Sequence, residues 1–439
     1  MIKKNRRTKI FFGWWTVLTG GILGLWVAGY HAYGFSALFK PIASELGFSR
    51  AVASVPSSIG RLEGGIEGPV AGWITDKFGP KWVVLSGVVL FSLGLILMNY
   101  INSIWAFYLV WGVIVGTGHN IATTVPIDTA ISNWFVKKRG VALSIRWVLS
   151  GLSGVLVLPL IAWLISTVGW RMTCVIGGMV MAVVGLPLTW FFLKQHRPEY
   201  YGMLPDGATA ADGAAETPQM IDRGVKYAAE VREVEFTLRQ AMRTRTYWLM
   251  ILVWSIYGLV MQGINVHSIP FLTDFGIEPV RAASVVAVMI LASLPSRFIA
   301  GFFIDRVRTE HLPFLVTGAY ALQAAGILIF LLYQTTAAIY LWFVLYGFGM
   351  GAGIALSSPM RARYFGRKAF GSIHGSSQMF ATPAGVIAPI YVGWVYDTTG
   401  SYMSVFVLFA VALGIASVLI IFARPPRPPA QVTDIRRIV

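Results

Sequence analysis

The chain has 439 residues, of which 56% are hydrophobic and only 12% are charged. Because a soluble globular domain carries roughly 25% charged residues, this composition excludes that class and predicts an integral membrane protein. The formal net charge of +16 resembles that of a nucleic-acid-binding protein, but the cations cluster between long apolar runs and not in one basic patch.

Twelve largely apolar runs of 18 or more residues are long enough to cross a bilayer core of about 30 Å as helices. They are predicted at 11–38, 50–72, 80–100, 104–130, 139–166, 169–193, 246–271, 280–303, 312–333, 338–359, 369–395 and 402–423. The first run follows a basic start, as in a signal peptide. It is too long for one and lacks a clear cleavage site, so we interpret it as the first membrane helix.

The distribution of lysine and arginine predicts the orientation of these helices. If the N-terminus is cytoplasmic, the cytoplasmic segments hold most of the cations, including Lys137, Lys138 and Arg139 before span five and Arg361, Arg363, Arg367 and Lys368 before span eleven. The outside loops near Asn102 and Thr335 hold none. This bias follows the positive-inside rule and predicts a multi-pass protein of the plasma or inner membrane with both termini in the cytoplasm.

The spans divide into two blocks of six. We predict an N-terminal half at 1–193, a cytoplasmic connector at 194–243, a C-terminal half at 244–425 and a cytoplasmic tail at 426–439. The Ala/Gly/Asp-rich middle of the connector is typical of a flexible linker, and its end, 236–242, is expected to form a short surface helix.

The two blocks are internal repeats. The segment from Gly72 to Asp76 recurs from Gly301 to Asp305, at an offset of 229 residues. The other matches are Gly112, Gly116 and Gly118 with Gly347, Gly351 and Gly353, and Arg139-x-x-x-x-Ser144-Ile145 with Arg367-x-x-x-x-Ser372-Ile373. Two parallel six-helix repeats with a connector are typical of a transporter whose binding site lies at the midplane between the halves.

A turn motif follows span two. Gly72 permits close helix approach, Asp76 can face a helix N-terminus or a basic side chain, and Gly79-Pro80 forms the turn before Lys81. An ordinary charged turn is the alternative. The segment resembles the loop signature between helices two and three of the major facilitator superfamily, and the resemblance covers essentially the whole chain. It implies the all-α major facilitator fold, in which this loop latches the cytoplasmic side of the outward-open state.

Three further segments resemble the monocarboxylate transporters and the related oxalate/formate antiporter-like proteins. They are Phe12-Gly13-Trp14-Trp15, the run from Trp134 to Ala142, and Tyr364-Phe365-Gly366-Arg367. In that family an arginine of helix eight binds the substrate carboxylate, and this arginine corresponds by position to Arg297.

Arg297 is also unusual by itself. It lies about 12 Å inside the water-facing end of span eight, near mid-depth, and it cannot lose its charge. A membrane-buried arginine faces an internal partner or a water-filled cavity, so Arg297 either forms a structural ion pair or binds an anion. The resemblance favours anion binding.

The chain departs from the family at three positions. Ser293 stands where proton-coupled members usually carry an aspartate, Tyr33 where they carry a lysine, and Ser376-Ser377-Gln378 where dicarboxylate-type relatives add a lysine. The usual proton site and second cation are therefore missing, which favours a monocarboxylate over oxalate.

Other charges lie inside the spans. Glu63 and Glu67 share one face of span two, and they either brace the N-terminal half by pairing with Arg61 or Arg146, or carry a coupling proton. Arg146 either pairs with a glutamate or lines the cavity. We assign structural or gating roles to Gly72, Asp76, Gly79, Lys81, Gly301, Asp305, Arg61 and Arg146.

Polar residues in otherwise apolar spans are the remaining candidates. A lone histidine in such a span is more often a satisfied core residue than a ligand. With Arg297, the candidate substrate-binding residues are His31, Tyr33, His119, Asn120, His267 and Gln378.

The absence of several sequence motifs narrows the function. No Gly-x-x-x-x-Gly-Lys-[Ser/Thr], His-Glu-x-x-His or nucleophile-elbow motif occurs, so neither an ATP-driven pump nor an enzyme is expected. The single cysteine, Cys174, excludes an intrachain disulfide, and no cofactor or nucleic-acid partner is expected.

These patterns predict a monomeric secondary active transporter of a small organic anion, such as lactate, pyruvate or formate. It would work by alternating access, with proton symport or anion exchange. A non-transporting sensor or scaffold on a transporter fold, or a transporter of a non-anionic solute, are the alternatives.

Overall fold

The structure, a computed structural model, describes residues 10–47, 50–208, 217–230 and 234–427, and these contain helices and turns without β-strands. The N-terminal half comprises α1 (Gly13–Ala28), η1 (Gly29–Tyr33), α2 (Gly34–Leu46), α3 (Arg50–Phe78), α4 (Pro80–Leu97), η2 (Met98–Tyr100), α5 (Ile104–Phe107), η3 (Tyr108–Val115), α6 (Gly116–Thr123), α7 (Val125–Trp134), α8 (Arg139–Gly151), α9 (Ser153–Val180), η4 (Met181–Gly185) and α10 (Leu186–Phe192).

The connector and the C-terminal half follow. The connector contains η5 (Pro198–Tyr201), η6 (Pro205–Gly207), α11 (Thr217–Ala229) and α12 (Leu238–Met242). The C-terminal half comprises α13 (Arg245–Asp274), α14 (Pro279–Arg306), η7 (Thr309–His311), α15 (Leu312–Tyr333), α16 (Thr336–Phe365), α17 (Phe370–Thr399) and α18 (Met403–Ile421).

The helices form the twelve membrane-spanning segments expected from the sequence. Among the described residues, nine helical segments are long and apolar enough to cross a membrane. The longest, Arg139–Phe192, contains two of the twelve because it turns back at Gly169, where φ is +78°. Two further spans complete the two sets of six. One is α1–α2, which η1 interrupts, and the other is α3, which contains charged residues.

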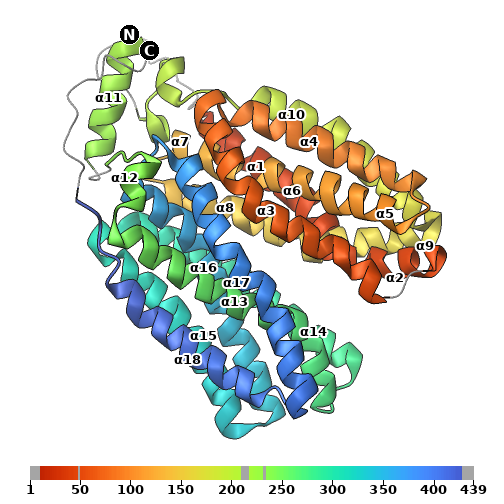
Figure 1. The fold of residues 1–439 in the computed structure, drawn as a ribbon. Coiled ribbons are helices and arrows are strands. Elements are labelled where there is room, and N and C mark those ends of the chain that lie inside the picture. Colours follow the sequence, from red (N-terminus) through yellow and green to blue (C-terminus); the bar gives the residue numbers. More distant parts are fainter. Residues whose placement is uncertain (1–9, 48–49, 209–216, 231–233, 428–439) are drawn as a thin grey trace, which may run out of the picture.

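The two halves converge at the end of the molecule that carries α11 and α12 and diverge toward the opposite end (Figure 1). We call these the connector side and the far side. Glycines allow the close approach, with α3 packed on α17 and α8 on α14. A Cβ added at Gly68 would lie 2.8 Å from the carbonyl oxygen of Gly375, and one at Gly140 would lie 2.7 Å from that of Gly301.

Two carboxylates join the halves at the connector side. Asp76, at the end of α3, accepts hydrogen bonds from the backbone N–H groups of Gly371 (2.9 Å) and Ser372 (2.7 Å) in the first turn of α17. Asp305, at the end of α14, accepts equivalent bonds from Gly140 (2.7 Å) and Val141 (2.8 Å) in the first turn of α8. Each carboxylate satisfies free N–H groups at the positive end of a helix, so the repeated motif forms two matched latches.

The turn between α3 and α4 depends on Gly79, whose φ of +85° favours glycine. Lys81, which follows this turn, places its ammonium 4.2 Å from the centroid of the Trp190 ring, at the surface of the N-terminal half. Gly79 and Lys81 therefore shape the start of α4.

The connector contacts both halves. Asp206 accepts hydrogen bonds from the backbone N–H groups of Val136, Lys137 and Lys138, and Glu199 forms a buried ion pair with Arg367 (3.1 Å). Its last helix, α12, begins with a capping box between Thr237 and Gln240, close to the surface helix expected from the sequence.

The rest of the connector differs from the sequence-based expectation. Much of the stretch interpreted as a flexible linker, residues 209–216, lies outside the described residues, and α11 directly after it was not expected. Beyond α11, Glu235 forms an ion pair with Arg197 (2.9 Å). Burial raises the pKa of Glu235, but Arg197 and Arg367 outweigh this effect, so the pKa lies below its usual range.

Candidate functional site

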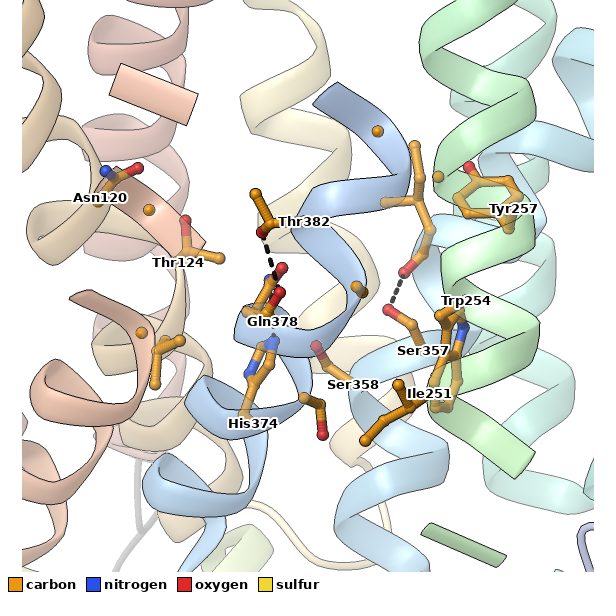
Figure 2. Close-up of a pocket in the computed structure, with 18 of the residues that line it drawn as sticks. Asn120, Thr124, Ile251, Trp254, Tyr257, Ser357, Ser358, His374, Gln378 and Thr382 are labelled. Carbon is orange, nitrogen blue, oxygen red and sulfur yellow. Dashed lines mark hydrogen bonds between the residues drawn. The ribbon is translucent and has the colours of Figure 1, made fainter. Parts of the chain in front are cut away.

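A cavity of about 380 Å³ lies between the two halves. Its wall is formed by residues of α3, α6, α7 and α8 from the N-terminal half and of α13, α16 and α17 from the C-terminal half. Figure 2 shows His374, Gln378 and Thr382 along α17, between Asn120 and Thr124 on one side and Trp254 and Tyr257 on the other. Residues from both repeats therefore surround one space, as the internal duplication predicts.

Arg361 is the one arginine among the described residues that line this cavity. The sequence analysis ended span ten at 359 and placed Arg361 in a cytoplasmic loop. The structure corrects this placement, because α16 continues to Phe365 and leaves Arg361 only 5% exposed. Its guanidinium carbon lies 4.8 Å from the centroid of the Trp254 ring, and its Nη1 is buried without a hydrogen-bond partner.

Asp128 on α7 is a fully buried acid close enough to act on Arg361, and it was not among the predicted site residues. One carboxylate oxygen accepts a hydrogen bond from the Ser358 hydroxyl across the halves (2.7 Å), and the other lies 3.6 Å from Nη1 of Arg146. Arg146 also donates to the carbonyl oxygen of Thr123. A signal for Asp128 existed in the sequence, because Pro126-Ile127-Asp128 and Pro359-Met360-Arg361 occupy equivalent places in the two repeats.

Arg146 therefore pairs with Asp128, and no ion pair between it and Glu63 or Glu67 is found in the described part of the chain. Its guanidinium also lies 3.9 Å from the centroid of the Trp147 ring. The side chain of Arg61 lies outside the described residues, so the bracing pair expected with it has no structural counterpart here.

Arg297 lies beside the cavity and is not part of its described lining. Its side chain is 5% exposed, its Nη1 donates to the backbone oxygen of Trp147 in the other half (2.7 Å), and its Nη2 donates to the Ser293 hydroxyl (3.3 Å). Within the described residues no acidic side chain lies within ion-pair distance of it. Arg297 is therefore placed as a buried cation that joins α14 to α8, directly behind a cavity-lining tryptophan.

The two glutamates of α3 differ in their surroundings. Glu67 lines the cavity and accepts hydrogen bonds from the Thr117 hydroxyl and from the side-chain amide of Asn120 (3.2 Å). It also borders an apolar groove between α3, α4 and α6. Glu63, one turn away, lies deeper in the N-terminal half, and its Oε2 is buried without a hydrogen-bond partner. The structure thus places Glu67, and not Glu63, at the cavity wall.

The three histidines predicted to bind substrate lie away from the described cavity lining. His31, in the π-helical segment η1, stacks on His119 with ring centroids 4.4 Å apart. His267 contacts the backbone oxygen of Pro389 (3.0 Å) and packs against the Tyr402 ring within the C-terminal half. Tyr33 packs near Gly154, also away from the lining.

The remaining polar candidates do line the cavity. Asn120 and Gln378 reach it from opposite halves, and Gln378 lies next to His374, with their side-chain nitrogens 3.4 Å apart. His374, which was not among the predicted substrate-binding residues, is therefore a further lining residue. The described lining combines the Arg361 guanidinium, the Glu67 carboxylate, several hydroxyl and amide groups, and apolar walls. A guanidinium beside apolar walls is suited to binding a small amphipathic anion.

Comparisons with known proteins agree with this architecture. The family model described as Major Facilitator Superfamily matches residues 21–389. Monocarboxylate transporter 13 of Rattus norvegicus is 23% identical over 90% of this chain and 85% of its own length. The uncharacterized MFS-type transporter YcxA of Bacillus subtilis (strain 168) is 24% identical over 88% of this chain and 89% of its own.

A solved structure shows the same fold. The crystal structure of the human organic anion transporter MFSD10 (TETRAN) matches with a TM-score of 0.69 and 14% identity, covering 92% of this chain and 99% of that one. The family model spans most of the chain, and the fold and the relatives are those of transporters and not of enzymes. The chain is therefore a membrane transporter of the Major Facilitator Superfamily.

Proposed function

We propose that the protein is a secondary active transporter of a small organic anion, in which a carboxylate is the recognised group. The observation that carries this proposal is Arg361, a buried guanidinium at the wall of the cavity between the halves with an unsatisfied nitrogen. An arginine cannot discharge itself, so a cavity that holds one favours a solute that brings negative charge.

The charges around the cavity support the same conclusion. Arg146, Arg297 and Arg361 lie close enough to influence one another or Asp128, and Asp128 is the acid paired with Arg146. Within the described residues Arg361 forms no ion pair: Asp128 is paired with Arg146, and Glu67 at the cavity wall accepts hydrogen bonds from Thr117 and Asn120. Burying unmatched charge is costly, so an anion that enters the cavity supplies compensation that the protein lacks.

Similarity to other proteins adds support at the level of substrate class. One relative is named a monocarboxylate transporter, and one structural neighbour is named an organic anion transporter. A sensor or scaffold on the same fold remains the competing function, but no structural observation favours it, and the cavity between the halves is what transport requires.

The direction of opening follows from the latches and the charge bias. By the positive-inside rule the connector side is cytoplasmic, and the Asp76 and Asp305 latches hold the halves together there. The described conformation is then closed inward, with the halves diverging outward. Alternating access requires both latches to break and the halves to rock about the site.

We propose two alternative forms of the transport cycle: substrate moves together with a proton, or one anion is exchanged for another. Because serine replaces the usual acid at position 293, a coupling proton would be carried by Glu67 or Glu63, of which only Glu67 reaches the cavity. The protein is proposed to act as a monomer in the plasma or inner membrane.

Flux in liposomes tests the proposed function. Purified protein is reconstituted, and uptake of lactate, pyruvate, formate and larger carboxylates is measured beside the uncharged amide of each acid. We expect protein-dependent uptake of at least one acid and none of its amide. Protein that binds acids without moving them supports the sensor, and equal uptake of acids and amides contradicts an anionic substrate.

A further inference from the structure

The cavity has a specific chemistry that narrows the substrate class. Resting on the proposed function, we propose that Arg361 binds the anionic group of the substrate. We further propose that the remaining cavity holds an aromatic or branched apolar body, so that the substrate is larger than a three-carbon acid.

Arg361 has donor capacity that the protein leaves unused. Its side chain is 95% buried, its Nη1 has no hydrogen-bond partner, and its guanidinium carbon lies 4.8 Å from the centroid of the Trp254 ring. Arg297 also has a buried nitrogen without a partner, its Nε, but its two other nitrogens already donate to Trp147 and Ser293. A buried charged donor without a partner is costly, so the site around Arg361 is incomplete until an acceptor arrives.

The surroundings of Arg361 leave room for that acceptor. Asp128, whose charge acts on Arg361, is hydrogen-bonded to Ser358 and paired with Arg146. The Ser357 hydroxyl donates to the backbone oxygen of Ile354 (3.0 Å). Neither group satisfies Arg361, and a ligand carboxylate could form the two parallel hydrogen bonds that a guanidinium favours.

The position of Arg361 in the repeat is also suited to a site shared by both halves. Asp128 and Arg361 each stand two residues after a proline, Pro126 or Pro359, at equivalent places in the two halves. The pseudosymmetry therefore sets an acid opposite a base across the centre of the molecule. An anion held by Arg361 lies beside the contact between Asp128 and Ser358 that links the halves.

The size and walls of the cavity define the rest of the ligand. Its volume of about 380 Å³ falls within the range of pockets that enclose drug-sized ligands, about 300–1,000 Å³. Trp254, Tyr257 and Met261 of α13 supply an apolar wall, and Gln262 and Gln378 add polar edges. Figure 2 shows the Trp254 and Tyr257 rings on one helix beside Ser357 and Ser358.

One glycine marks open space in this wall. Gly258 lines the cavity, and a Cβ added there would meet no heavy atom within 4 Å. The backbone is helical, so a larger side chain is accommodated without strain and extends into space next to Trp254 and Tyr257. Gly258→Leu therefore reduces cavity volume while leaving the charge of the site unchanged.

Binding of chosen probes tests both parts of the proposal. Detergent-purified full-length protein is titrated with phenylacetate, lactate and the neutral phenylacetamide, and thermal stabilisation is measured. For wild type we expect phenylacetate to bind at least about 10-fold more tightly than lactate, and phenylacetamide not to stabilise. Arg361→Lys should weaken phenylacetate binding about 10- to 100-fold, and Arg361→Gln should abolish it.

Two further variants separate the roles. Arg281→Gln removes an exposed arginine outside the cavity lining and should bind as wild type does. Gly258→Leu should weaken phenylacetate at least about 10-fold and change lactate little. If Arg361→Gln does not fold, the Arg361→Lys titration decides, with its melting temperature without ligand as the control.

Each outcome distinguishes this inference from the proposed function. Wild-type affinity in a folded Arg361→Gln or Arg361→Lys protein overturns Arg361 as the anchor while leaving an anion transporter intact. Equal binding of lactate and phenylacetate, or no effect of Gly258→Leu, overturns the apolar body. If no carboxylate binds to wild type or is taken up into liposomes, the proposed function itself fails.

Discussion

Arg146, Arg297 and Arg361 lie at or near the cavity between the halves, and their partners differ. Each has a buried nitrogen without a hydrogen-bond partner. Arg146 pairs with Asp128 and Arg297 donates to the backbone of the opposite half, whereas Arg361 forms no hydrogen bond or ion pair within the described residues. A carbonyl partner can be exchanged for a carboxylate at little cost, because both accept hydrogen bonds. We therefore expect Arg297 to hold the halves together in this state and to reach an anion in another.

Arg297 provides the first prediction. Arg297→Lys should reduce carboxylate transport by about 10- to 100-fold, because an ammonium cannot reproduce two parallel hydrogen bonds, each worth about 1.5–3 kcal/mol. Arg297→Ala should abolish transport. Initial uptake rates in liposomes measure both, with Arg281→Gln as the surface control. A folded Arg297→Ala protein with wild-type uptake would remove this residue from the mechanism.

Glu67 provides a prediction about coupling. Its two oxygens accept hydrogen bonds from Thr117 and Asn120. Its position at the cavity wall suits a group that takes up a proton from the cavity and releases it there. Glu67→Gln keeps the shape but cannot ionise, so uptake driven by a pH gradient should fall at least about 10-fold while exchange of one anion for another persists. Glu63→Gln should have a smaller effect.

A bracing role gives a different result for the same variants. If Glu67 only stabilises the N-terminal half, Glu67→Gln should lower the yield and melting temperature and reduce coupled uptake and exchange together. Measuring both transport modes on the same proteoliposome preparation, with protein content determined, separates the two roles.

Contacts at helix ends hold the two halves together on the connector side. Asp76 and Asp305 each bind the first turn of a helix in the other half, so they add specific hydrogen bonds to the close glycine contacts of α3 with α17 and of α8 with α14. Loss of one charge weakens bonds that exist only while this side is closed. The balance between the two transport states should therefore shift toward the state open on the connector side.

The latch gives a third prediction. Asp76→Asn should lower the ratio of connector-closed to connector-open protein by about 10-fold or more, because one set of charge-assisted hydrogen bonds is lost. A cysteine at cavity-lining Thr382, in a Cys174→Ala background, reports the change as slower labelling by an impermeant thiol reagent from the far side. Asp222→Asn, on exposed α11, is the matched control, and unchanged labelling in Asp76→Asn would contradict the latch.

The connector gives a pH-dependent prediction. The pKa of Glu235 is lowered mainly by Arg197 and Arg367 against the opposing effect of burial, so its ion pair stabilises the fold above the pKa that this glutamate has in the unfolded chain. The contribution is lost as pH falls through the lower, folded pKa. The melting-temperature difference between wild type and Glu235→Gln should be largest near pH 7 and shrink below about pH 4. A constant difference over this range would assign Glu235 no electrostatic role.

At the scale of the whole molecule, orientation can be tested directly. In a Cys174→Ala background, single cysteines at Asn102 and Thr335 should be labelled from outside by an impermeant reagent, and one at Asp222 should not. The turns that hold Asn102 and Thr335 lie at the far side of the molecule, and α11, which holds Asp222, lies at the connector side (Figure 1). Asp222 is preferable to the nearby Gly207 as a cysteine position, because the φ of +72° at Gly207 disfavours a cysteine. Labelling at Asp222 alone would reverse the proposed topology.

The architecture could be predicted because its causes are local or periodic. Apolar runs of sufficient length insert as helices, and the duplicated Gly72–Asp76 and Gly301–Asp305 segments identify the two halves and their shared turn. Hydrogen bonding within each helix satisfies its backbone, so the spans follow from hydropathy without knowledge of their neighbours. The family and the six-plus-six arrangement were accordingly evident from residue order.

The site depends on contacts between distant segments, which residue order does not reveal. In the sequence, Arg361 follows an apolar run and therefore resembles a cation of a loop. In the structure, α16 extends past it, and its guanidinium is buried against Trp254 of α13. Asp128 and Arg146 meet only because α7 and α8 pack together, and Arg297 finds its acceptor in the opposite half. Hydropathy determines that a helix enters the membrane, whereas helix packing selects which charge reaches the cavity.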